Sequence, residues 1–208
     1  MAARTWIDRQ LRARGIRDER VLAAMAAVDR EQFVPDEFRA AAYDDGPIPL
    51  PHGQTISQPY MVAVTCEALA LGGDERVLDV GTGSGYAAAV LAELAAFVYT
   101  IERIPALAEA ARAALAEGGY GQVSVHVGDG SLGLPEHAPY DAIAVAAAAD
   151  RLPTALWQQL RLGGRIAVPL RSGRGGRQHL CVLERTGAGP RLVAAVPARF
   201  VPLVSGNP

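Results

Sequence analysis

Several kinds of reactive side chain are scarce in this sequence. It contains no lysine, since all 20 Lys and Arg residues are arginine. This excludes a phosphate-binding loop that depends on lysine, and it excludes catalysis through a lysine Schiff base. The two cysteines, Cys66 and Cys181, form no C-x-x-C pair, and we interpret them as buried thiols in a reducing compartment. The histidines are scattered, so we expect no metal site (His52, His126, His137, His179).

The sequence also lacks a strong charge of either sign and any long apolar run. Its formal net charge is −2, which gives no electrostatic footprint for nucleic acid or an anionic membrane. No apolar stretch reaches membrane-spanning length free of charges and prolines, and the N-terminus lacks a signal-peptide pattern. We therefore expect a cytoplasmic protein without nucleic-acid or membrane partners. We also expect a monomer, although none of these features determines the oligomeric state.

What the sequence does contain is a glycine-rich turn around which the rest is organised. In residues 76–86, an apolar strand runs into a G-x-G-x-G turn, and an alanine-rich helix is predicted over 87–96. Such a strand, turn and helix N-terminus bind nucleotide-type ligands in open α/β sheets. Gly81, Gly83 and Gly85 allow positive φ angles and close approach of the backbone to a ligand. Tyr86 stands where the dinucleotide fingerprint G-x-G-x-x-G has its last glycine.

Acidic residues at the ends of consecutive predicted strands indicate which ligand this is. Asp79 precedes the glycines, Glu102 lies 21 residues after Gly81, and Asp129 follows the strand predicted over 123–127. A carboxylate at the position of Glu102 can accept both ribose hydroxyls. Several carboxylates repel phosphates but suit a cationic adenosine ligand such as S-adenosylmethionine (SAM), which has a sulfonium, an ammonium and no phosphate. The alternative is that the glycines form only a tight turn.

The order of the other elements predicts the fold class. In the N-terminal part, Gly15 ends a first helix and Asp18 caps a second. Helices and strands are expected to alternate after this, with a turn over 172–177. The helices are expected at 61–71, 87–96 and 153–160, and the strands at 76–80, 97–102, 123–127, 139–145, 165–170, 178–184 and 192–201. This indicates an α/β, doubly wound Rossmann-like sheet with helices on both faces, an N-terminal helical extension and an antiparallel edge.

At 208 residues and 50% hydrophobic composition, we expect one domain over 1–208. Residues 1–60 would supply the N-terminal helices and a loop for substrate and cofactor, and 61–208 the Rossmann-like core. Within the first part, residues 39–51 are rich in prolines and turn formers and are predicted to be an ordered loop.

The segment Gly-Gln-Thr-Ile-Ser-Gln-Pro-Tyr at 53–60 has two interpretations. Ser57 stands where the N-cap of the helix at 61–71 is expected, and Pro59 suits its first turn. Ser57 is then only a cap. In the other interpretation, this turn at a helix N-terminus presents hydroxyl and amide donors to a carboxylate.

Nearly the whole sequence resembles one family of SAM-dependent enzymes. The resemblance rests on GQTISQPYMVA (53–63), LDVGTGSGY (78–86), VYTIE (98–102), VGDG (127–130), APYDAI (138–143), QLRLGGRIAVP (159–169) and RFVPL (199–203). On these motifs the chain is similar to the protein-L-isoaspartate (D-aspartate) O-methyltransferases. The resemblance implies that Ser57 is the active-site residue and that the following residues bind the cofactor: Thr55, Ile56, Asp79, Gly81, Gly83, Gly85, Glu102, Asp129 and Gly130.

The resemblance also implies an activity. Such an enzyme transfers a methyl group from SAM to the free α-carboxylate of L-isoaspartyl residues in damaged proteins or peptides, releases S-adenosyl-L-homocysteine, and starts repair through a succinimide. One alternative is a related O-methyltransferase acting on a normal aspartate of a dedicated peptide. Two others are a SAM-sensing binding module and an α/β hydrolase using Ser131, where Asp129 departs from G-x-S-x-G.

Overall fold

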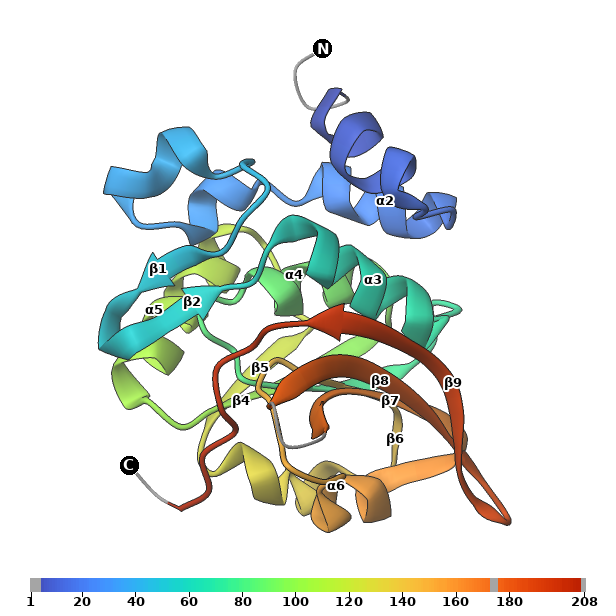
Figure 1. Cartoon of the computed structure of the whole chain (residues 1–208). Coiled ribbons are helices and arrows are strands. Elements are labelled where there is room, and N and C mark those ends of the chain that lie inside the picture. The colour runs from blue at the N-terminus through green and yellow to red at the C-terminus, as the bar shows by residue number, and fades with distance from the viewer. Residues whose placement is uncertain (1–4, 173–175, 207–208) are drawn as a thin grey trace.

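A seven-stranded β-sheet with the order β5-β4-β3-β6-β7-β8-β9 forms the centre of the protein (Figure 1). The computed structural model describes residues 5–172 and 176–206. Neighbouring strands are parallel from β5 to β7, whereas β8 is antiparallel to both β7 and β9. The strands are β3 (Arg76–Val80), β4 (Phe97–Glu102), β5 (Val123–Val127), β6 (Tyr140–Val145), β7 (Leu160–Ser172), β8 (Arg177–Thr186) and β9 (Gly189–Ala198). This confirms the predicted doubly wound sheet with an antiparallel edge.

Helices cover both faces of the sheet, as the strand–helix alternation predicts (Figure 1). On one face lie α3 (Pro59–Leu69), α4 (Tyr86–Ala92) and α5 (Pro105–Glu117), and on the other lies α6 (Thr154–Gln159). Side chains of one strand alternate between the two faces: Val77 belongs to the larger apolar core, and Leu78 and Val80 belong to the smaller one around α6.

The N-terminal extension packs on the larger core. It consists of η1 (Ile7–Leu11), η2 (Arg12–Arg14), α2 (Glu19–Ala27), η3 (Arg30–Phe33) and η4 (Asp36–Ala41). Gly15 ends the first helical stretch with a φ of 102°, and Asp18 caps α2 by accepting the amide hydrogen of Arg20, so both predicted signals are confirmed. Its buried side chains pack with those of α3 and α4. The division of the chain at residue 60 stays a prediction.

Two segments differ from the sequence prediction. Residues expected as a loop contain β1 (Ile48–Leu50), which pairs with β2 (Gln54–Ile56) in an antiparallel hairpin. The last strand ends at Ala198, not at 201, because the following segment leaves the sheet edge and pairs with Ala148: the amide of Ala148 donates to Val201 O (2.7 Å), and the amide of Leu203 donates to Ala148 O (2.8 Å).

Three smaller points complete the comparison. Helix α4 is shorter than predicted, and β7 extends further in both directions. Part of the turn expected over 172–177, residues 173–175, lies outside the described residues. Within 5–172 and 176–206, every helix is too short or too polar to cross a lipid bilayer.

Candidate functional site

The glycine turn after β3 has the backbone geometry that its sequence predicts. Gly81, Gly83 and Gly85 have φ angles of 97°, 54° and 92°, which other residues rarely adopt. The amide of Gly81 donates to Ile101 O (2.9 Å), and the amide of Gly85 donates to Thr82 O (2.8 Å). A Cβ atom on Gly85 would lie 3.2 Å from Cγ of Leu115, so helix α5 also requires glycine here.

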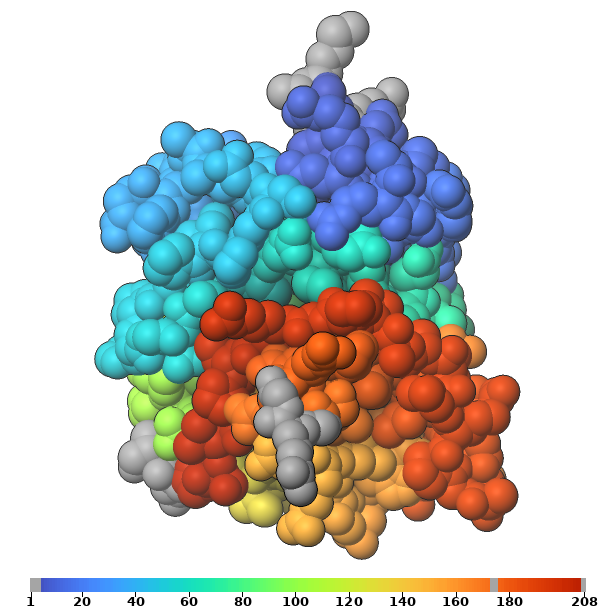
Figure 2. Space-filling view, viewed as in Figure 1, coloured from blue at the N-terminus to red at the C-terminus, as the bar shows by residue number. Residues whose placement is uncertain are grey.

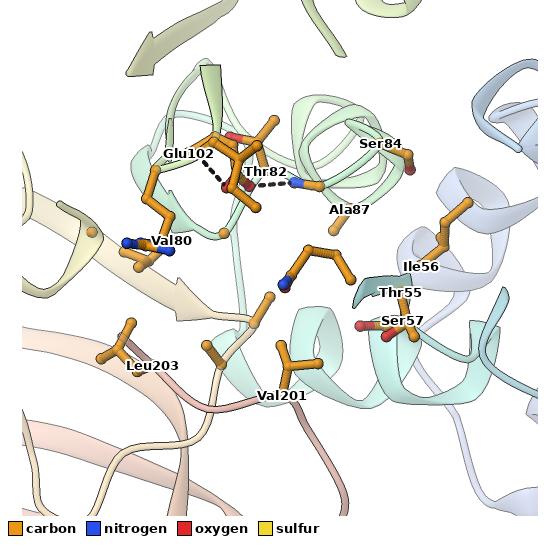
Figure 3. Close-up of a pocket in the computed structure, with 18 of the residues that line it drawn as sticks. Thr55, Ile56, Ser57, Val80, Thr82, Ser84, Ala87, Glu102, Val201 and Leu203 are labelled. Carbon is orange, nitrogen blue, oxygen red and sulfur yellow. Dashed lines mark hydrogen bonds between the residues drawn. The ribbon is translucent and has the colours of Figure 1, made fainter. Parts of the chain in front are cut away.

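Glu102 ends β4 beside this turn, with its side chain held by main-chain donors. Its Oε2 accepts the amide hydrogen of Gly83 at 2.9 Å, and its Oε1 accepts that of Ile104 at 3.0 Å (Figure 3). Each oxygen of a carboxylate has two acceptor positions, so one on each oxygen remains. The residue is only 6% exposed and lines the pocket. The arrangement fits a pair of ribose hydroxyls.

The pocket lies between the glycine turn, the end of hairpin β1–β2 and the segment after β9 (Figure 3). Its lining is largely apolar, with Val80, Ile101 and Val201 among the contributors. Gly130 belongs to the lining, and a Cβ atom there would lie 2.6 Å from Cγ1 of Val80, so a side chain at this position would clash with the Val80 side chain. The pocket fits a flat apolar ring system next to a diol.

Asp129 lies next to the pocket, and its side chain faces away toward the chain's C-terminal segment. Its Oδ1 accepts from both N and Oγ of Ser131, and its Oδ2 accepts the amide hydrogen of Gly206 at 2.6 Å. Partial burial raises the pKa of Asp129, but the hydrogen bonds from Ser131 and Gly206 outweigh it, so the pKa lies below its usual value. A cofactor role for Asp129 stays a prediction. Because the Ser131 hydroxyl bonds to a carboxylate and not to a histidine, the hydrolase alternative loses its catalytic base.

Asp79 is buried directly below the glycine turn. Its Oδ2 accepts from Oγ1 of Thr100 (2.8 Å), which in turn lies 2.6 Å from Oγ1 of Thr82. Burial raises the pKa of Asp79 to about 7, against the bond from Thr100, and the charge of Glu102 raises it further. The carboxyl lines a small inner cavity that also contacts Ser57 and Ala87.

Ser57 lies where the pocket opens into an outer groove. Together with Thr55, Ala146 and Val201 it lines both. Helix α3 begins at Pro59 with Gln58 at the N-cap position, and no side-chain oxygen in the described structure caps it. The interpretation of Ser57 as a helix cap is therefore wrong. The cap position falls one residue later because β2 extends to Ile56, whose buried side chain fixes the end of the hairpin.

The outer groove runs where the N-terminal part of the chain (blue to cyan) meets the C-terminal segment (red) in Figure 2. One wall comes from Arg14, hairpin β1–β2 and the start of helix α3, and the other comes from residues 197–201. Arg14 lies at its end, paired with Asp45 at 2.8 Å and placed 3.6 Å above the ring of Tyr60. The groove is open and has both polar and apolar lining, which suits a peptide bound at the surface.

Arg30 is a residue of this region that the sequence analysis did not single out. It is fully buried on η3, where its Nε donates to Ala42 O (2.7 Å) and its Nη2 donates to Ser57 O (2.9 Å). Its guanidinium lies 4.4 Å from the ring centre of Tyr86, the residue after the last glycine of the turn. The local sequence pattern does not distinguish Arg30 from an exposed arginine, because its partners come from other segments of the chain.

Two of the histidines, expected to be scattered, come together on the α6 face of the sheet. The rings of His126 and His137 lie 5.1 Å apart, and one donor atom each of His126, His137 and Glu136 lie within 4.8 Å of one another. His126 bonds to Ser124 (2.9 Å) and His137 stacks on Tyr99, so both rings have partners within the protein. The absence of a bound metal stays a prediction.

The strand order, the glycine turn and the acid at the end of the next strand define a Rossmann-like methyltransferase fold. A family model described as "Protein-L-isoaspartate(D-aspartate) O-methyltransferase (PCMT)" matches residues 4–208. The chain is 54% identical over 204 residues to Protein-L-isoaspartate O-methyltransferase 2 of Anaeromyxobacter sp. (strain Fw109-5), covering 98% of this chain and 84% of that protein. It is 53% identical to the enzyme of the same name from Marinobacter nauticus, covering 97% and 92%.

Solved structures agree. A protein-L-isoaspartate O-methyltransferase matches with a TM-score of 0.88 at 27% identity, covering 99% of this chain and 66% of that one. A putative enzyme of the same name from Plasmodium falciparum, in complex with S-adenosyl-L-homocysteine, has a TM-score of 0.83 at 24% identity over 97% of this chain and 98% of that one, which shows the shared fold. The chain belongs to the protein-L-isoaspartate (D-aspartate) O-methyltransferase family.

Proposed function

We propose that this protein is an enzyme that transfers a methyl group from SAM to the free α-carboxylate of L-isoaspartyl residues in damaged proteins or peptides. The observation that carries the proposal is the position of Ser57 at the junction between the pocket and the outer groove. The pocket would then hold the methyl donor and the outer groove a peptide, and both ligands would lie next to the hydroxyl of Ser57. Membership in the family supports the same reaction.

The pocket fits SAM by the chemistry of its donors and acceptors. The acceptor positions left on Glu102 would take the ribose hydroxyls, and the glycine turn lets the backbone lie against the ligand. Asp79 would face the ammonium group, and Thr55 and Ile56 would close the pocket from the hairpin. When bound, SAM supplies an electrophilic methyl group on a sulfonium.

The residues at the junction have little proton chemistry to perform. A free carboxyl with a pKa of about 4 is already ionised at neutral pH, so no general base is required. We assign to the Ser57 hydroxyl the task of holding one carboxylate oxygen, so that the other is directed into the pocket. Such orientation supplies several kcal/mol in related intramolecular reactions. The apolar lining from Ala146 and Val201 excludes water from the two charged partners.

The product of this transfer would be a methyl ester, which needs no further catalysis by the protein. The amide nitrogen of the following residue attacks the ester carbonyl, the nitrogen–carbon bond forms, and methanol leaves with the amide proton. The resulting succinimide hydrolyses partly to normal aspartate, which is the repair.

The outer groove supports a peptide bound along residues 196–202, largely through its backbone. We propose further that the enzyme acts as a monomer in the cytoplasm on damaged proteins, without nucleic-acid or membrane partners. A dedicated peptide with a normal aspartate is the alternative substrate.

Matched peptides test this proposal. Incubation with labelled SAM is expected to methylate an isoaspartyl peptide far faster than the same peptide with normal aspartate, because the free carboxylate sits one methylene closer to the backbone. A displacement of about 1 Å can cost on the order of a hundredfold in rate. Mass spectrometry then follows the succinimide. Equal methylation of both peptides, or of the aspartyl peptide alone, would contradict the repair function and leave the methyltransferase in place.

A further inference from the structure

The charge on Arg30 is buried without a carboxylate beside it. The side chain is 0% exposed, and none of the ion pairs in the described part of the chain includes it. Its partners are two carbonyl oxygens and an aromatic ring, and Nη1 is buried without any partner among the described residues. Buried charges in proteins are normally paired, because an unpaired one is strongly destabilising. The structure therefore keeps a positive charge inside at a cost to stability.

The partners of Arg30 show where this charge acts. Ala42 follows η4, Ser57 follows hairpin β1–β2, and Tyr86 begins helix α4 behind the glycine turn. These segments are distant in sequence, and the guanidinium contacts all three of them. Its rigid planar fork can hold two acceptors at once while its face lies on a ring. Arg30 thus joins the loop that carries Ser57 to the helix that carries the glycine turn.

The proposed reaction brings a negative charge to the same place. The carboxylate of the peptide would lie at Ser57, and the carbonyl of Ser57 accepts directly from Arg30. Opposite charges attract far more strongly in a partly buried site than in water. Two arginines line the groove: Arg14 is paired with Asp45, and Arg199 is exposed. Arg30 lines neither the groove nor the pocket, but it lies directly behind the junction, with Nη2 2.9 Å from the carbonyl oxygen of Ser57.

We propose that Arg30 is a positioning residue that fixes Ser57 against the glycine turn and makes the junction selective for an ionised carboxylate over a neutral carboxamide. This inference rests on the proposed function, and it adds a source of specificity that the pocket lining does not contain. A carboxylate bound at Ser57 would lie near this otherwise unpaired cation, with the Ser57 main chain between the two charges.

The test compares two peptides that differ only in charge at the reacting group. One carries isoaspartate, and the other carries its α-carboxamide, isoasparagine. Dissociation constants of both are measured by calorimetry with protein saturated with S-adenosyl-L-homocysteine, and kcat and KM are measured for the isoaspartyl peptide. We expect wild type to bind the carboxylate at least about tenfold more tightly than the carboxamide.

Two variants separate charge from geometry. Arg30→Met removes the charge, so the preference for the carboxylate is expected to fall toward one and KM to rise about tenfold. Arg30→Lys keeps a charge without the rigid fork, so the preference should stay within about threefold of wild type while kcat falls. The affinity for S-adenosyl-L-homocysteine should change less than about threefold in both. Arg39→Met, at an exposed arginine on η4 paired with Asp36, is the matched control and should behave as wild type.

The outcomes distinguish this inference from the proposed function. Wild type that fails to methylate the isoaspartyl peptide contradicts both. Wild type that methylates it, with an unchanged carboxylate preference in Arg30→Met, overturns the role of Arg30 alone. If Arg30→Met does not fold, Arg30→Lys decides: loss of the preference with a charge still present contradicts the inference, and its retention with a lowered kcat supports it.

Discussion

The cofactor half and the substrate half of the site are built in different ways. The first is assembled from short segments at the ends of β3 and β4, where main-chain amides and glycines make the contacts. The second is assembled from hairpin β1–β2, the N-terminal helices and residues 197–201, which are distant in sequence. The cofactor half is fixed by local backbone geometry, and the substrate half by long-range side-chain contacts.

This difference predicts how substitutions in the two halves affect the protein. A glycine turn at the end of a buried strand can hardly vary, since side chains rarely adopt its φ angles and a Cβ atom on Gly85 would press against Leu115. The substrate half depends on few anchors, with Arg30 at their centre. Substitutions in the first half should therefore abolish ligand binding, whereas those in the second should change turnover and selectivity.

The largest effect should come from Glu102→Ala in the cofactor half. In the proposed complex the variant would lack two hydrogen bonds to ribose, each worth on the order of 1.5–3 kcal/mol and not additive, and it leaves the amides of Gly83 and Ile104 without this acceptor. We expect the Kd of S-adenosyl-L-homocysteine to rise about a hundredfold in calorimetry. Glu109→Ala, at an exposed acid on α5, is the control. Unchanged affinity in Glu102→Ala would remove this residue from the site.

A smaller effect is expected in the substrate half from Ser57→Ala. The hydroxyl does not cap α3, so stability should be nearly unchanged, while kcat/KM falls by about tenfold or more with little change in cofactor affinity. Ser84→Ala is a matched control, because Ser84 lines the pocket but not the outer groove. The role of Ser57 is contradicted if kcat/KM stays at the wild-type value, or if both variants lose it equally.

The same comparison explains what the sequence could predict. Strands β4 and β5 were predicted to the residue, and the glycine turn with Glu102 was recognised, because period, glycine spacing and strand-end acids are local signals. Hairpin β1–β2 was missed, since its three-residue strands are too short to show an alternating pattern next to several prolines.

Long-range contacts account for the other differences. Local pattern placed the helix cap at Ser57, but β2, in which Ile56 pairs with Ile48, extends to Ile56, and the cap position falls at Gln58. Arg30 looks like any charged residue between helices, and only the folded chain brings Ala42 and Ser57 to it. The histidines meet because β5 and the turn η7 (Pro135–His137) are neighbours in space.

The smallest predicted effect concerns Asp79, which lies between the two halves and should make cofactor binding depend on pH. Its pKa is raised to about 7, chiefly by burial, so it is largely neutral at pH 6 and largely ionised at pH 8. A ligand ammonium binds the ionised form. The affinity for S-adenosyl-L-homocysteine should therefore be up to about tenfold weaker at pH 6 than at pH 8.

Asp79→Asn should bind more weakly than wild type at pH 8, and its affinity should not vary between these two pH values. The free energy of unfolding provides an independent check, because it should change with pH in the direction opposite to the ligand affinity. Because the folded pKa lies above the value of about 3.9 in the unfolded chain, the folded state binds the extra proton between about pH 4 and 7. The free energy of unfolding should thus fall through this window as pH rises, and the contribution should be absent in Asp79→Asn. A wild-type affinity that is flat from pH 6 to 8 would place the ammonium elsewhere and leave Asp79 as a buried partner of Thr100.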